Sequence, residues 1–245
     1  MDAQAPRDPG ARKSAPRHLG LTALRLVTIA ACLAFALMLA TAPPREAPRV
    51  GAIGAGCSYE LDTWTGRLTI RPTDGVSGEM AHVYSALPED DLRHAVRSVS
   101  VERGVLAPAD SSHLFWSLDA AEALDLSGLD TSRVTDMGGM FYGCSSLASL
   151  DLSGWDTSGA GGMWGMFAGC ASLSSLAVGE RCGGVLSADR HTALPAGVGG
   201  WGWHSERDKR WLTLSELSSS RQGVADTYTA PGAWRSLVQA TPASP

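Results

Sequence analysis

The stretch MFYGCSSLASLDLSGWDTS, Met140–Ser158, is followed by a near copy, MFAGCASLSSLAVGE, Met166–Glu180. The methionine, phenylalanine, glycine and cysteine of this text, and Leu147 and Leu150 after them, all recur at an interval of 26 residues. A degenerate earlier copy, SSHLFWSLDAAEALDLSG, begins at Ser111. One period shared by several independent positions is typical of a solenoid, in which each repeat forms one coil.

Each copy also contains an LxxLxL pattern that predicts a short strand. Leu150 and Leu152 lie two residues apart, so on a strand both point inward while Asp151 points outward. Strands of successive copies are expected to stack in parallel about 4.8 Å apart, with the Met-x-x-Met-Phe text as a second wall. The residues expected to form the core of the coils are Leu124, Leu126, Phe141, Cys144, Leu147, Leu150, Leu152, Phe167, Cys170, Leu173 and Leu176.

The recurring cysteine is expected to pack as a small apolar side chain. Leu118 holds its position in the degenerate copy, and unpaired cysteine is among the most buried residue types. A Cys144–Cys170 disulfide is conceivable at stacking distance, but parallel side-chain vectors suit that bond poorly, so buried thiols are favoured. Gly143 and Gly154 are expected at turns that need unusual backbone angles.

With the segment VTDMGGMFYGCSSLASLDLSGWDTS, Val134–Ser158, the chain resembles the BspA-like leucine-rich repeats of bacterial surface proteins. The resemblance extends over roughly Gly66 to Ala230. It implies an exported, non-enzymatic protein without a cofactor that binds host extracellular proteins or other microbes. The array is short, the second copy has SGAGGM where the first has SRVTDM, and no wall-sorting signal is visible. Attachment to the cell would therefore fall to the N-terminal segment.

The N-terminal segment has the composition of an export signal. Residues 1–25 carry a net charge of +3, and residues 26–42 carry no charge. This pattern fits either a cleaved signal peptide or a retained transmembrane signal anchor. A cleavage motif at Ala40–Ala42 is followed by Pro43, which disfavours cleavage, so both alternatives stay open. The expected location is the cell surface, or the medium if the segment is removed.

The chain as a whole is expected to be mainly β, with short helical or irregular turns. The repeat array would be a short leucine-rich-repeat solenoid with β-rich caps at both ends, preceded by an apolar helix. The expected organisation is a basic N-terminus at 1–18, the signal or anchor at 19–42, a linker at 43–56, an N-terminal cap at 57–97, the solenoid at 98–178, a C-terminal cap at 179–230 and a tail at 231–245.

Composition and motifs also exclude several kinds of function. The net charge is −5, which disfavours nucleic acid as a partner. No CxxC or CxxH pair suggests a metal site. No GxSxG, HExxH or phosphate-binding loop suggests an enzyme. Two alternatives remain: a structural envelope protein with too few repeats to bind alone, and an enzyme with an unrecognised site near His191 or His204.

The candidate interaction surface combines outward acids with tryptophans, because tryptophan is a frequent interface anchor. Its members are Asp125, Asp151, Trp155, Trp164, Trp201 and Trp203. Two acids in register are one feature of a calcium site, but the dense oxygen ligands of a calcium-binding loop are missing, so turn-capping carboxylates are favoured. Trp155 replaces Leu129 at its repeat position, which favours burial. GGWGWHSERDKRW, Gly199–Trp211, faintly resembles a cell-wall carbohydrate module but is expected to be a capping hairpin whose tryptophans cover the open end of the stack.

Overall fold

The structure, a computed structural model, describes residues 46–186, 192, 194–195, 202–220 and 223–230, all within one unit, Glu46–Pro245. Its elements in chain order are β1 (Arg49–Ala52), β2 (Cys57–Asp62), β3 (Arg67–Pro72), β4 (Gly78–Glu79), α2 (Val83–Ala86), α3 (Asp90–Ala95), β5 (Ser98–Val101), β6 (Val105–Leu106), β7 (Ala123–Asp125), β8 (Leu129–Asp130), β9 (Ser149–Leu152), β10 (Ser175–Val178), the 3₁₀ turn η1 (Gly183–Leu186), β11 (Trp203–Ser205), β12 (Arg210–Leu212), α4 (Leu214–Ser220) and β13 (Asp226–Thr229).

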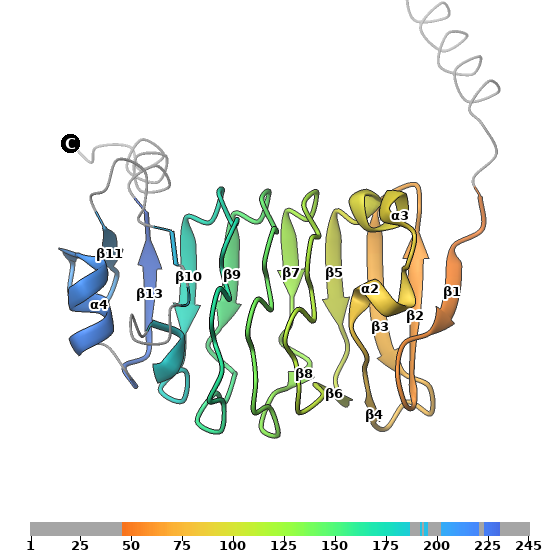
Figure 1. Ribbon diagram of the computed structural model, residues 1–245, viewed down its shortest axis with the longest axis horizontal. Helices are drawn as coiled ribbons and strands as arrows, with labels where there is room; N and C mark the ends of the chain where they lie inside the picture. The colour runs from red at the N-terminus through yellow and green to blue at the C-terminus, as the bar shows by residue number, and fades with distance from the viewer. Residues whose placement is uncertain (1–45, 187–191, 193, 196–201, 221–222, 231–245) are drawn as a thin grey trace, which may run out of the picture. The chain divides into compact units, whose positions relative to one another are not determined.

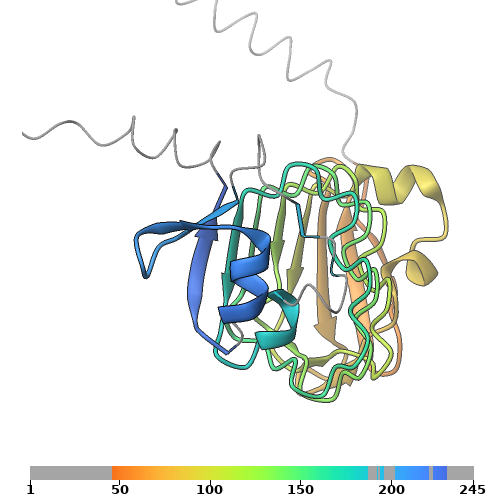
Figure 2. The same ribbon diagram turned by 60° about the vertical axis from the view of Figure 1, so that its left-hand side comes forward.

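These elements form a β-solenoid, as the 26-residue period predicts. The main sheet has the order β1-β2-β3-β5-β7-β9-β10-β13-β11-β12, and the five strands from β3 to β10 run parallel. A second wall is the small parallel sheet β4-β6-β8. The third side of each coil consists of turns, and we call this side the turn wall. Figure 2 shows the successive coils superposed around a common interior.

Four turns of chain connect the five parallel strands (Figure 1). Their register partners are Arg67, Ser98, Ala123, Ser149 and Ser175, which are 31, 25, 26 and 26 residues apart. We name the intervening segments coil 1 (67–97), coil 2 (98–122), coil 3 (123–148) and coil 4 (149–174). The two regular intervals are those that the repeated text predicts.

The stack begins one coil earlier than the sequence suggested. Residues 57–97 were expected to be a cap outside the solenoid, but β3 pairs in parallel with β5 and β4 pairs in parallel with β6. Only β1 and β2, which pair antiparallel, cover the end of the stack. Coil 1 was not predicted because α2 and α3 lengthen it and because its sequence lacks the repeated motif.

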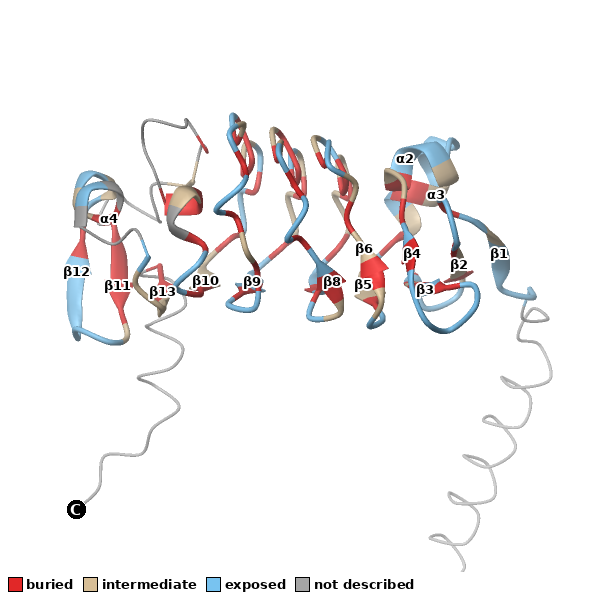
Figure 3. Ribbon diagram, turned by 90° about the horizontal axis from the view of Figure 1, so that it is seen from below, coloured by how far each residue is buried: buried red, intermediate tan, exposed pale blue. Residues whose placement is uncertain are grey.

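The core is one continuous cluster of buried side chains that runs through all the coils. Figure 3 shows buried segments, in red, recurring along the whole stack. All eleven expected core residues are buried. Phe115, Phe141 and Phe167 occupy equivalent positions and stack with ring centroids 5.8 and 5.9 Å apart and nearly parallel planes. This phenylalanine ladder crosses coils 2, 3 and 4 and joins each coil to the next.

The turn wall repeats its backbone angles as regularly as its sequence. Gly143 and Gly169 have φ of 79° and 80°, and the equivalent residue of coil 2, Ser117, has φ of 58°. The recurring glycine therefore serves a left-handed turn that a serine adopts at a cost in coil 2. Gly154, expected at a similar turn, does not have a positive φ, so that expectation was wrong.

The cysteines of the repeat are buried thiols. Cys144 donates a hydrogen bond to the carbonyl of Phe115 at 3.2 Å, and Cys170 donates to the carbonyl of Phe141 at 3.1 Å. Neither forms a disulfide. Burial raises the pKa of each thiol to about 12. Each thiol therefore links a coil to the one before it.

Alkylation should distinguish these buried thiols from accessible ones. Because the thiolate is the nucleophile, we expect iodoacetamide at neutral pH to modify Cys144 and Cys170 at least ~100-fold more slowly in the native chain than in denaturant. Peptide mass spectrometry after timed quenching gives both rates. Similar native and denatured rates at these two positions would contradict the buried arrangement.

The C-terminal cap closes the stack with antiparallel strands. The β13 strand pairs antiparallel with β10, β11 pairs with β13, and β12 completes a hairpin with β11. The predicted hairpin is thus present, but β13, from farther along the chain, is the strand that covers the last coil. An antiparallel partner satisfies the edge of β10 without continuing the parallel stack.

The expectations for residues 1–45 and for the tail 231–245 lie outside the described residues. Within the part of the chain that the structure describes, no helix has the length and apolar character needed to cross a membrane.

Candidate functional site

The six candidate interaction residues have different surroundings. Asp125 and Asp151 are exposed on β7 and β9, and Trp164 is 68% exposed on the turn wall. Trp155 and Trp203 are buried, and the Trp203 Nε1 donates to the carbonyl of Pro195 at 2.9 Å. Trp203 has no surface to offer a partner, so its inclusion was wrong. Trp201 lies outside the described residues.

The two acids cap turns at the ends of their strands. Asp125 Oδ1 accepts hydrogen bonds from the N–H and the hydroxyl of Ser127 at 3.2 and 2.7 Å. Asp151 Oδ1 accepts from the N–H of Ser153 at 2.8 Å. No group of three or more histidine, cysteine or acidic side chains converges on a metal position among the described residues. The hydrogen bonds from the two serines agree with the turn-capping interpretation of both acids.

The β-ladder between β7 and β9 is interrupted just beside these acids. It has one register pair, Ala123 with Ser149. The preceding step, β5 to β7, has three pairs, and the following step, β9 to β10, has four. Figure 1 shows β7 and β9 farther apart than the neighbouring strands. The uniform stacking expected from the sequence therefore fails at this one step.

A cavity of about 200 Å³ occupies the interruption, and we call it the inter-coil cleft. Coil 3 lines it with Leu124, Asp125, Leu126, Ser127 and Leu129, and coil 4 lines it with Asp151, Ser153, Gly154 and Trp155. Three of the six candidate residues thus meet in one place. Their convergence could not be read from the chain, because the period alone predicts a closed stack.

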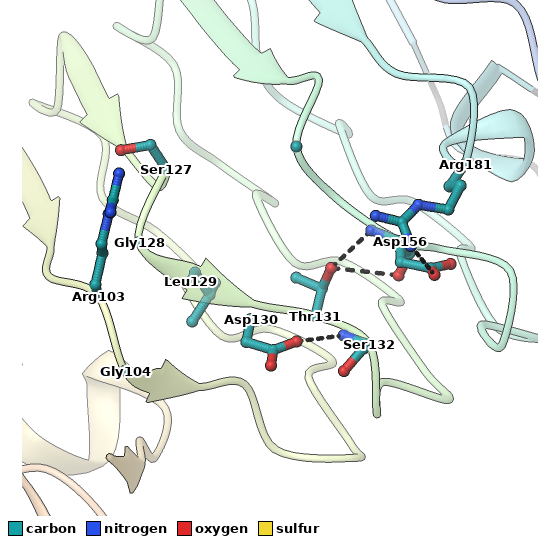
Figure 4. A pocket seen from close by; sticks show the side chains of 11 residues that line it. Arg103, Gly104, Ser127, Gly128, Leu129, Asp130, Thr131, Ser132, Asp156 and Arg181 are labelled. Atoms are coloured by element: carbon teal, nitrogen blue, oxygen red, sulfur yellow. Dashed lines mark hydrogen bonds and ion pairs between the residues drawn. The ribbon is translucent and has the colours of Figure 1, made fainter. Parts of the chain in front are cut away.

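A wider, more polar cavity of about 410 Å³ adjoins the inter-coil cleft and shares Ser127, Leu129 and Gly154 with it. Figure 4 shows Arg103 on one flank and Arg181, paired with Asp156 at 3.2 Å, on the other. Further along, the Thr131 hydroxyl accepts from the Asp156 N–H and donates to its carbonyl. These two bonds reconnect coils 3 and 4 beyond the opening.

Two acids that line this second cavity, Asp130 and Asp156, are held as carboxylates. Hydrogen bonds from Ser132 keep the pKa of Asp130 below its usual value. Those from the hydroxyl and N–H of Ser158 lower the pKa of Asp156 in the same way. With Arg103 and Arg181 opposite them, the charges of this cavity balance.

The turn wall carries a second feature, an exposed aromatic column. The hydrogen bonds from Val83 N–H to Leu114 and from Phe115 N–H to Met140 put Tyr84, Trp116 and Tyr142 at one position in successive coils. Tyr84 and Tyr142 are 41% and 44% exposed, and Trp116 is half-buried. Each follows a residue of the inner column, Val83, Phe115 or Phe141. In each of these coils, one residue therefore packs in the core and the next residue belongs to the aromatic column on the surface.

Trp116 is held in place by its neighbours. The guanidinium of Arg93 lies 5.9 Å from its ring centroid, and Tyr84 contacts it edge-on at 6.2 Å. Arg93 is itself buried and donates to the carbonyls of Leu87 and Pro88 at 2.7 and 3.0 Å. The column is therefore rigid at its centre, which lowers the entropy lost on binding. Neither Trp116 nor either tyrosine is among the six candidate residues that the sequence suggested.

The histidine considered for an enzymatic site has a structural setting. His204 is buried, with Nδ1 3.3 Å from Glu206 Oε1 and its ring against Trp211. It lines neither of the two cavities described above. His191 lies outside the described residues.

Comparison with known proteins identifies the repeat region alone. The family described as "Mycoplasma protein of unknown function, DUF285" matches residues 109–178, which hold both full repeats and the degenerate copy. No curated protein and no solved structure matches the chain.

Proposed function

We propose that this chain is an exported cell-surface module that binds a protein partner and so mediates adhesion. The observation that carries the proposal is the exposed aromatic side chains on the turn wall: Tyr84, Trp116 and Tyr142 of the aromatic column, with Trp164 in coil 4. Tryptophan and tyrosine are enriched among the residues that dominate protein interfaces. Exposing Trp164 to water at 68% costs free energy unless a partner covers it.

The repeats supply a rigid support for this surface. Coils 2, 3 and 4 contact one another through the phenylalanine ladder and the cysteine hydrogen bonds, as in solenoids that present extended binding surfaces. The similarity to BspA-like leucine-rich repeats and the DUF285 match favour a surface protein. The basic and then apolar N-terminal sequence favours export and attachment, with residues 1–25 inside the cell.

Protease shaving of intact cells that produce the full chain tests export. We expect external protease to remove residues 46–230 and to leave residues 1–42 with the cell, as mass spectrometry of both fractions would show. A full-length chain protected inside the cell would sink the proposal.

Adhesion should depend on the turn wall. We expect the double variant Tyr142→Ala and Trp164→Ala to reduce attachment of producing cells to immobilised host matrix proteins at least ~10-fold, since interface tryptophans and tyrosines often contribute 2 kcal/mol or more. Trp64→Ala is the matched control, because Trp64 is 58% exposed in the β2–β3 turn, away from the wall. Equal adhesion of all three strains would point to a structural envelope role instead.

A further inference from the structure

The inter-coil cleft opens where two like charges meet. In the regular register Asp125 faces Ser100 on one side, and Asp151 faces Ala177 on the other. Continued pairing of β7 with β9 would set Asp125 directly against Asp151, but the ladder stops at Ala123 and Ser149. Like charges opposite each other destabilise a strand pair. The β7–β9 ladder therefore stops just before the position at which Asp125 would face Asp151.

A large side chain also lines the cavity at this step. Trp155 takes the place that Leu129 holds in coil 3, and it is only 3% exposed. Its ring stacks on Phe141 at 6.1 Å, while its Nε1 has no hydrogen-bond partner among the described residues. A buried unsatisfied donor costs about 1–3 kcal/mol. The chain thus departs from its own repeat at the one place where the stack opens, a departure that is common at functional sites.

The walls of the cleft combine an apolar interior with an acidic rim. Leu124, Leu126, Leu129 and Trp155 line it, and Asp125 and Asp151 are exposed at its edge. Gly154 adds space, since a Cβ on it would meet no atom within 4 Å, whereas the equivalent Gly128 is 2.3 Å from the Val101 carbonyl by the same measure. The opening is therefore specific to the step between coils 3 and 4.

We infer that the inter-coil cleft receives a lysine side chain from the protein partner. The alkyl stem packs against the leucines and Trp155, and the ammonium group lies between the carboxylates of Asp125 and Asp151. Only Oδ1 of each acid accepts a bond within the turns, so the second carboxylate oxygen of each acid remains to accept from the cation. An ammonium group there would offset the like charge of the two acids and add charge-assisted hydrogen bonds.

Other occupants fit less well. Calcium takes six to eight oxygen ligands, whereas the cleft offers two carboxylates and two serines among leucine and tryptophan side chains. An anion would face the acidic rim, since the outward residues of β5, β7, β9 and β10 include no lysine or arginine. The planar guanidinium of arginine pairs best with a single carboxylate, and the compact ammonium suits a position between two.

The inference rests on the proposed function only for the source of the lysine. The chemistry of the cleft is tested separately with Nα-acetyl-lysine methylamide as the probe, added to the ¹⁵N-labelled full chain. We expect saturable NMR shifts of the Trp155 indole N–H and of amides in 124–129 and 151–155, with a dissociation constant of ~1–10 mM. The Trp155 signal is assigned by its loss in Trp155→Leu.

The controls test separately the charge of the ammonium group, the apolar stem of the probe and the opening between coils 3 and 4. The uncharged Nα-acetyl-norleucine methylamide should bind at least ~5-fold more weakly, and so should the lysine probe to Asp125→Asn or Asp151→Asn. Asp136→Asn, which alters a similar turn on the other wall, should bind the probe normally. Trp155→Leu should lose probe binding and gain amide protection at 124–126 as the ladder closes.

Three results would overturn the inference: no saturable shift with the lysine probe, equal binding of the norleucine probe, or displacement of the lysine probe by calcium chloride at lower concentration. If the adhesion test fails while the lysine probe binds normally, the proposed protein partner is wrong but the lysine-binding cleft stands. If the lysine probe does not bind while adhesion is normal, the lysine-binding cleft is wrong but adhesion through the turn wall stands.

Discussion

Replacing Phe141 with alanine should lower the free energy of unfolding by about 3–5 kcal/mol, the usual cost of deleting a fully buried phenylalanine. The residue is the middle rung of the phenylalanine ladder, with Phe115 and Phe167 stacked on its two faces at 5.8 and 5.9 Å. The Trp155 ring also lies against it, with ring centroids 6.1 Å apart and planes inclined by 27°. The change therefore removes one side chain but weakens the contacts between coils 2, 3 and 4 together.

Urea unfolding of the full chain, followed by circular dichroism, measures this effect. Tyr142→Ala is the control, because the tyrosine is adjacent in sequence and 44% exposed, and we expect it to cost less than about 1 kcal/mol. Similar losses in both variants would mean that the ladder does not join the coils. Hydrogen exchange should place the loss of protection of Phe141→Ala in coils 2 to 4, since solenoid coils are stabilised by their neighbours.

Replacing Gly128 with alanine should cost about 1–3 kcal/mol, the range for inserting a methyl group into packed surroundings. Its Cβ would lie 2.3 Å from the Val101 carbonyl oxygen and 2.7 Å from the Arg103 nitrogen, both backbone atoms of coil 2. Backbone cannot rotate away as a side chain can, so coils 2 and 3 must separate at this corner. The φ of Gly128 is not positive, so the cost comes from the contact and not from strain.

Gly154→Ala is the matched control at the equivalent position of the next repeat. Its Cβ would have no atom within 4 Å, and we expect the stability to change by less than ~0.5 kcal/mol. Both variants can be compared in one series of urea titrations. Equal costs would mean that the inter-coil cleft is closed in solution, because Gly154 would then pack as Gly128 does.

The sequence predicted those features that repeat from coil to coil. The 26-residue interval specifies which residues stack, so the buried positions of Leu150, Leu152, Phe141 and Cys144 follow from it. Turn chemistry acts over two or three residues, and for that reason the capping role of Asp125 and Asp151 was predictable. The left-handed turn at Gly143 was predictable on the same local grounds.

Features without repeated text were not predictable. Coil 1 has the geometry of a coil but carries α2 and α3 in place of the motif. The order β10-β13-β11-β12 of the C-terminal cap depends on which strand reaches the open edge first, and no local pattern reports that. The aromatic column was missed because the turn wall has no simple alternation that separates Phe141, inside, from Tyr142, outside.

The sequence by itself determined the solenoid, its period and its core, because a repeated pattern describes each coil and its contact with the next. Only the tertiary structure decided where the stack opens and which surfaces remain available. The opening lies where continued pairing of β7 with β9 would set Asp125 against Asp151 and where Trp155 lines the cavity, so strand pairing competes there with like charge and side-chain volume. Such a balance arises from contacts between coils, and the period, which is the same at each step, carries no information about it.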